Sequence, residues 1–124
     1  MTKLASLLED FKKAIARLEE VLAVPKTEIT RDSAIKRFEI AFDLAWKTSK
    51  AFIEERHSST CASPQSCFKE AFRLGITEYD DLWIDLGKTR NETVHNYSEE
   101  FSERAYSKLP DALAAFKKLL SNLS

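Results

Sequence analysis

The sequence has little glycine, proline or cysteine, and each shortage narrows the class of fold. Its 124 residues include two Gly, three Pro and two Cys. Few Gly and Pro leave few sharp turns, which favours a small number of long elements. Two cysteines are too few for a disulfide framework. Cys61 and Cys67 do not have Cys-x-x-Cys spacing and no histidine cluster accompanies them, so the sequence predicts two ordinary thiols and no zinc or other metal site.

The sequence also lacks a charge excess and a long apolar run. Its formal net charge is −1, which gives no reason to expect binding to nucleic acid or to an anionic membrane. No stretch approaches the roughly 18 apolar residues of a membrane span. The N-terminal residues, Met1-Thr2-Lys3-Leu4, do not have the basic region and apolar run of a signal peptide. We therefore expect a cytoplasmic protein with no membrane association.

The pattern that is present is helical. The composition, 44% hydrophobic and 31% charged, suits one soluble globular domain over residues 1–124. Apolar residues recur at steps of three and four, which is the spacing of an amphipathic α-helix, and no segment alternates like a strand. The sequence therefore predicts an all-α fold, an antiparallel up-down four-helix bundle with one extra short helix.

Capping residues and prolines indicate where the helices begin and end. The first helix is expected over Thr2–Leu22, and the second is expected to end near Arg56. The expected N-caps are Thr30 or Asp32 for the second helix, Ser63 (before Pro64) for the short one, Thr77 with Asp80 for the fourth, and Asn96 or Ser98 for the last. Gly75 is placed to close the short helix in the left-handed conformation. Pro110 either kinks the last helix or restarts it.

A polar cluster is expected on the last turns of the fourth predicted helix, and it holds the candidate functional residues. Arg90, Asn91, His95 and Tyr97 fall within eight residues, and Asn91 and His95 are four apart, so they are expected to share one helix face. Arg carries a planar fork of donors that suits phosphate oxygens. An unperturbed His titrates near pH ~6.5 and can exchange a proton at cellular pH. These residue types could cleave RNA through its own 2′-hydroxyl without a metal or other cofactor, with His95 as base or acid and Arg90 stabilising the charge at phosphorus.

Two features bear on this interpretation. Each chain supplies only one Arg90 and His95 pair, which is few groups for acid–base catalysis. A homodimer that brings two such pairs together is therefore expected. The segment from Glu78 to Glu103 holds eight acidic residues and two basic ones, so an RNA groove would need basic side chains from elsewhere. The candidates are Lys36, Arg37, Lys47 and Lys50. The acidic rim could instead meet a basic protein partner.

Gly87 interrupts the fourth helical pattern and has two interpretations. It allows the close approach of a neighbouring helix or chain, or it is a tolerated surface glycine.

Three motifs in order resemble a known family. Arg90-Asn91-x-x-x-His95, extended by His95-x-Tyr97, resembles the Arg-x(4–6)-His motif of the HEPN superfamily. The second-helix segment Arg37-Phe38-Glu39-x-x-Phe42-Asp43-x-Ala45-Trp46-Lys47 is similar to one HEPN branch, the nucleotidyltransferase substrate-binding protein family. Ser63-Pro64 leading to Ala71-Phe72, with Trp83 ahead of the motif, is the third match. We associate an acidic residue with the position before Arg-Asn in this family. The sequence departs from that pattern, because Thr89 occupies this position.

The resemblance implies a dimeric four-helix bundle and a partner, a minimal nucleotidyltransferase usually encoded nearby. Such pairs are toxin–antitoxin modules in which the HEPN protein is a metal-independent endoribonuclease neutralised by the nucleotidyltransferase. By position, Arg90 and His95 would be catalytic and Asn91 would support them. Tyr97 would be the residue that the partner modifies with AMP. The alternative is a substrate-binding and assembly subunit of a two-component nucleotidyltransferase, with no catalysis of its own.

Overall fold

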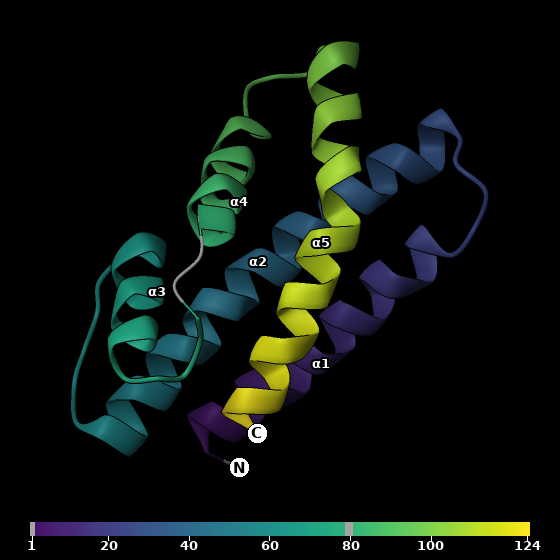
Figure 1. Cartoon of the computed structure of the whole chain (residues 1–124). Helices are drawn as coiled ribbons and strands as arrows, with labels where there is room; N and C mark the ends of the chain where they lie inside the picture. Colours follow the sequence, from purple (N-terminus) through teal and green to yellow (C-terminus); the bar gives the residue numbers. More distant parts are fainter. Residues whose placement is uncertain (1, 79–80) are drawn as a thin grey trace.

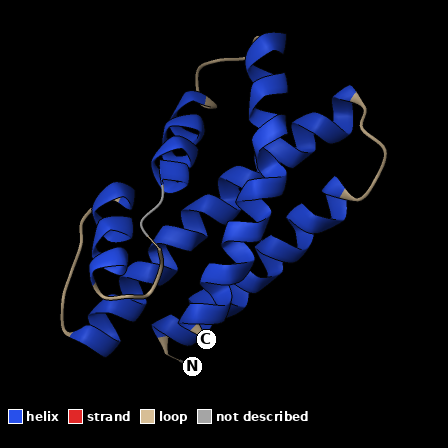
Figure 2. Ribbon diagram, viewed as in Figure 1, coloured by secondary structure: helices blue, strands red, loops and turns tan. Residues whose placement is uncertain are grey.

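The described residues form a bundle of five helices. The computed structural model describes residues 2–78 and 81–124. Its helices are α1 Lys3–Leu22, α2 Glu28–His57, α3 Pro64–Arg73, α4 Asp81–Glu92 and α5 Glu99–Leu123 (Figure 1). Every described residue lies in a helix or in a connecting segment (Figure 2). The predicted all-α bundle of four helices and one shorter helix is confirmed.

Helix α2 is the shared element of the bundle. It is 30 residues long and packs against each of the other four helices. Helices α1 and α5 lie along one side of it, while α3 and α4 lie on the other (Figure 1). Within the described residues, α1 has no contact with α3 or α4. The bundle therefore has two regions that meet along α2.

The centre of the α1, α2 and α5 region is filled by phenylalanine. Phe11, Phe38 and Phe116 come from the three helices and are completely buried. The Phe11 and Phe116 rings meet edge to face at 6.1 Å, and the Phe38 and Phe116 rings are stacked at 6.2 Å. These residues belong to the apolar stripes that the sequence shows at steps of three and four. Burial of such stripes explains why the three longest helices pack together.

The first turn of α2 begins earlier than the sequence predicts. The N-cap is Thr27, whose hydroxyl accepts a hydrogen bond from the Thr30 N–H at 3.1 Å. The Thr30 hydroxyl in turn accepts from the Thr27 N–H at 2.7 Å. The prediction of Thr30 or Asp32 as the cap was wrong, because Thr30 is the third helical residue of a reciprocal capping box.

Most other helix ends agree with the sequence. Ser63 caps α3, Ser98 caps α5, and Gly75 has a positive φ of 76° just beyond α3. Helix α5 continues through Pro110 and does not restart there. The prediction of Thr77 as the N-cap of α4 was wrong, because Glu78 is not helical and α4 begins at Asp81. The Thr77 hydroxyl instead donates to the Glu78 carbonyl. The expected partner of Thr77, Asp80, lies outside the described residues.

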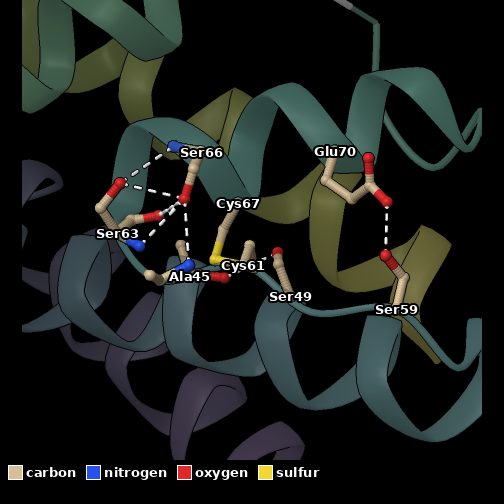
Figure 3. The surroundings of a disulfide bond; sticks show 9 residues. Ala45, Ser49, Ser59, Cys61, Ser63, Ser66, Cys67 and Glu70 are labelled. Carbon is tan, nitrogen blue, oxygen red and sulfur yellow. Dashed lines mark hydrogen bonds between the residues drawn. A yellow bond between two sulfur atoms is a disulfide. The ribbon is translucent and has the colours of Figure 1, made fainter.

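The two cysteines form a disulfide, which corrects the prediction of two ordinary thiols. Cys61 lies in the loop after α2, and Cys67 lies on α3. Figure 3 shows the bond above α2, close to Ala45 and Ser49. The loop runs back over α2 and brings the two Cα atoms to 5.1 Å, which is within the range that a disulfide spans. Spacing along the sequence does not reveal this reversal of direction.

A buried arginine joins the beginnings of α2 and α5. Arg31 is 5% exposed, and its guanidinium donates to both carboxylate oxygens of Glu99, at 2.6 and 3.1 Å. It also donates to Glu103 at 3.2 Å. The hydrogen bonds to Glu99 and Asp32 raise the pKa of Arg31, so its positive charge persists at any accessible pH.

Among the described helices, none is long and apolar enough to cross a membrane.

Candidate functional site

Arg90 lies on the last turn of α4 and is held by α2. Its Nε donates to Asp43 Oδ1 and its Nη2 donates to Asp43 Oδ2, both at 3.2 Å. The Arg90 side chain is 24% exposed, so the ion pair is partly shielded from water. The hydrogen bond to Asp43 raises the pKa of Arg90, and partial desolvation opposes this shift. Arg90 therefore stays charged, but a carboxylate already occupies two of its donors.

Asn91 also lies on α4, but it contributes to a different surface. Its side chain is exposed and lines a cavity together with Phe42 and Lys88. No hydrogen bond joins the Asn91 amide to Arg90 or His95 in the described part of the chain. The prediction that Arg90 and Asn91 lie on the last turns of a helix agrees with the structure.

His95 lies beyond the end of α4. The helix ends at Glu92, and the His95 N–H donates to the Glu92 carbonyl at 3.2 Å in a turn. Its side chain is exposed. The expectation that Asn91 and His95 share a helix face does not hold, because α4 ends at Glu92 and His95 lies in the turn beyond it. The Thr93 hydroxyl donates to the Arg90 carbonyl at 2.7 Å, and the chain then turns towards α5.

The turn that carries His95 and Tyr97 is organised by Asn96. The Asn96 side chain donates to the Glu92 carboxylate at 2.8 Å, and its oxygen accepts from the Ser98 N–H at 3.1 Å. Tyr97 is 82% exposed, and its hydroxyl donates to the Val94 carbonyl at 3.1 Å. The turn therefore presents the Tyr97 ring to solvent, where a second protein can reach it.

Thr89, where the sequence departs from the motif, is a buried residue. It is 4% exposed, and its hydroxyl donates to the Asp85 carbonyl at 3.0 Å. Lys108 on α5 donates to the Thr89 hydroxyl at 3.3 Å and to the Asp85 carboxylate at 3.0 Å. The carboxylate that meets this lysine therefore comes from one helical turn earlier.

The four basic residues suggested for an RNA groove do not act alike. Arg37 donates to the Arg17 carbonyl at 2.7 Å, so it is bound to α1. Lys36 lies 3.3 Å from the Glu39 carboxylate. Lys47 and Lys50 have no ion pair within the described residues. A shared basic groove beside Arg90 is thus not evident in one copy of the chain.

Sequence reasoning missed two parts of this region. Asp43 belongs to the second-helix motif, but the sequence assigns it no role, because 47 residues separate it from Arg90 and hide their contact. The sequence also does not predict the cavity beside Asn91, because residues from three separate helices form its walls. In both cases the long-range packing of α2 against α4 makes the contact.

The described fold resembles solved helical bundles. A Thermus thermophilus protein superposes with a TM-score of 0.86 at 29% identity, over 91% of this chain and 98% of its own. A Haemophilus influenzae protein superposes with a TM-score of 0.69 at 19% identity, over 97% of this chain and 96% of its own. Its structure was described as the fold of a substrate binding domain of a nucleotidyltransferase. These likenesses define the class of helical bundle.

The sequence itself identifies the family within that class. The family model described as "Nucleotidyltransferase substrate binding protein like" matches residues 6–124, and the chain belongs to this family. No protein with a curated functional description matches the sequence. The family predicted from the three motifs is confirmed.

Proposed function

We propose that this chain is the substrate-binding and assembly subunit of a two-component nucleotidyltransferase. The family match over residues 6–124 supports this role. The environment of Arg90 favours this role over catalysis, because Asp43 of the same chain already binds two of the guanidinium donors that catalysis would direct at a phosphate. Asp81 and Glu100 of the acidic segment are exposed and make no ion pair within the described residues, so they are available to a basic partner. The partner is a minimal nucleotidyltransferase encoded nearby, and we expect the complex in the cytoplasm.

Co-purification tests this assignment directly. The full chain is expressed with the neighbouring nucleotidyltransferase, and the mass of the complex is measured by size-exclusion chromatography with light scattering. We expect a stable complex that the double variant Arg90→Ala, His95→Ala also forms, because assembly needs no catalytic pair. Two proteins that elute separately at micromolar concentration would contradict the proposal.

A second candidate function is a metal-independent endoribonuclease, neutralised by the same partner as a toxin by its antitoxin. It is favoured by Arg90, Asn91 and His95 lying together at the end of α4 and in the turn after it. His95 would take the proton of a ribose 2′-hydroxyl, whose oxygen attacks phosphorus and forms a cyclic phosphate. The bond to the 5′-oxygen breaks, and that oxygen takes a proton from the second His95 of a homodimer. Arg90 would stabilise the charge on the phosphoryl oxygens.

Expression of the chain alone separates the two candidates. The intact chain is compared with the Arg90→Ala, His95→Ala variant for growth and for integrity of cellular RNA. A ribonuclease stops growth and cuts RNA only when intact. Equal growth and intact RNA at equal protein levels would leave the binding role alone standing.

Tyr97 is the proposed site of modification by the partner. Its exposed hydroxyl would attack the α-phosphorus of ATP, forming a tyrosyl phosphodiester and releasing pyrophosphate. Co-expression followed by mass measurement tests this step. We expect added AMP on the intact chain and none on Tyr97→Phe. Tyr106→Phe is the matched control, because Tyr106 is half-buried and its ring centroid lies 5.1 Å from the Lys26 Nζ. Equal added mass on Tyr97→Phe would exclude Tyr97.

A further inference from the structure

A cavity lies where α2, α3 and α4 meet, beside Asn91. Its volume is about 320 Å³, close to the lower end of the range for small-molecule sites. Phe42, Phe68 and Trp83 form much of its wall, and each of the three is less than 10% exposed. Their rings are fixed against one another, since Phe68 and Trp83 stack at 4.3 Å and Phe42 meets Phe68 at 5.7 Å. The wall is therefore apolar and aromatic, with its three rings packed against one another.

Gly87 leaves this cavity open. The glycine lies on α4 and lines the cavity. A Cβ added there would meet only Phe42, at an ordinary contact distance of 3.6 Å from its Cζ. Close packing of the described chain therefore does not require glycine at this position. The missing side chain instead keeps space free next to the aromatic wall.

The rim of the cavity is polar and positively charged. Lys69 on α3 and Lys88 on α4 line it, and neither makes an ion pair within the described residues. Gln65 and Asn91 add two amide side chains without internal hydrogen bonds in the same part of the chain. Glu78 also lines the cavity, but Lys118 pairs with it at 3.3 Å. Two unpaired cations thus remain beside an otherwise acidic segment.

We propose that this cavity binds a nucleoside monophosphate, with the base against the aromatic wall and the phosphate at Lys69 and Lys88. An apolar aromatic wall favours an aromatic ring, the two amides can pair with its polar edge, and two lysines select an anion. The volume falls within the range of small-molecule sites, which favours a single nucleotide as the occupant. The inference names the substrate class of the proposed subunit and in that sense rests on the proposed function.

Binding to the isolated full chain tests the inference without the partner. AMP is titrated while tryptophan fluorescence and heat are recorded, with adenosine and inorganic phosphate as separate probes. We expect saturable AMP binding, weaker adenosine binding and no measurable phosphate binding. The variant Lys69→Gln, Lys88→Gln is expected to lower AMP affinity about tenfold and to leave adenosine binding unchanged. Lys47→Gln is the matched control, since Lys47 is exposed, unpaired in the described chain and absent from the cavity.

Gly87→Leu tests whether the ligand occupies this cavity. Leucine fills the space beside Phe42, so binding of AMP and adenosine is expected to disappear while the helical circular dichroism stays. Gly87→Ala is a milder companion that keeps the protein folded. AMP binding that survives Gly87→Leu, or phosphate binding equal to that of AMP, would overturn the inference. A chain that joins its partner but does not bind AMP contradicts only the cavity site. A chain that binds AMP but does not join the partner contradicts only the proposed assembly.

Discussion

The two sides of α2 are built by different means. On one side, α1 and α5 cover α2 with long apolar stripes centred on Phe11, Phe38 and Phe116. On the other, α3 and α4 have only 10 and 12 residues, lengths at which an isolated helix is marginal in water. The discrete links that hold that side include the Cys61–Cys67 disulfide, the Asp43–Arg90 pair, the aromatic wall and the Lys108–Asp85 bond from α5 to α4. The candidate site lies on this side, where a substitution can remove one link and leave the others in place.

The largest expected effect is a loss of core packing at Phe116. Phe116→Ala removes a fully buried ring that contacts Phe11, Phe38 and Trp83. We expect the free energy of unfolding to fall by about 3–5 kcal/mol, because a cavity remains between the helices. Urea unfolding followed by circular dichroism measures it. Phe72→Ala is the control, since Phe72 is 49% exposed. Equal losses at both positions would show that burial of the Phe116 ring is not the source of the effect.

The second effect is reduction of the disulfide. Opening the short Cys61–Cys67 loop is expected to lower the free energy of unfolding by about 2 kcal/mol, because the unfolded chain gains freedom. Urea midpoints with and without a reductant give the difference. The variant Cys61→Ala, Cys67→Ala should not respond to the reductant. Proteolysis should then cut first in the loop before α3, and first cleavage within α1 or α5 would contradict a local effect.

The third effect is loss of the Asp43–Arg90 pair. Asp43→Asn keeps the shape of the side chain but removes its charge. Because the two side chains are 37% and 24% exposed, water screens the pair, and we expect a loss of only about 0.5–1 kcal/mol. A double-mutant cycle with Arg90→Met isolates the interaction. A coupling of zero would show that packing alone holds α4 against α2.

The smallest effect is a dependence on acid. Hydrogen bonds from Arg73 and Ser59 lower the pKa of Glu70 from 4.5 to about 2. Hydrogen bonds from Arg31 and Lys26 also lower the pKa values of Glu99 and Glu103. Each carboxylate therefore adds stability that is present above pH 4.5 and is lost as the pH falls through the value of the folded state.

Thermal unfolding measured from pH 6 to pH 2 tests this dependence. In Glu70→Gln, the drop in midpoint below about pH 4.5 should be shallower than in the intact chain. Glu54→Gln serves as the control, because Glu54 is exposed and makes no ion pair within the described residues. A parallel drop in all three proteins would exclude a contribution from Glu70.

Local signals predicted most of the fold, and long-range contacts account for most of what they missed. Ser63, Gly75 and Ser98 act through neighbours within five residues, so their roles follow from residue type. Thr27 acts locally too, but its pairing with Thr30 in a capping box was overlooked.

The site was less predictable because its partners are distant in the sequence. Arg90 and Asn91 lie on the predicted helix, but Asp43 meets Arg90 only when α4 packs on α2. The disulfide needs a loop that reverses over α2, and residue spacing does not report that path. His95 lies beyond the end of α4, in a turn where the hydroxyl of Thr93 and the side chain of Asn96 make hydrogen bonds. No local pattern separates such a turn from a continued helix.

The length of α2 has a consequence for how the protein opens. Because α2 belongs to both regions, α3 and α4 can detach while α1 and α5 still cover α2, once the Lys108–Asp85 bond and the Trp83–Phe116 ring contact between α4 and α5 are broken. Amide protons of α3 and α4 should then exchange with solvent by a local opening, whereas those in the middle of α2 exchange only when the whole bundle unfolds. Ligand or partner binding at the α3–α4 side should therefore slow exchange there first. The most protected amides would report the total stability of the chain, and they should lie in α2.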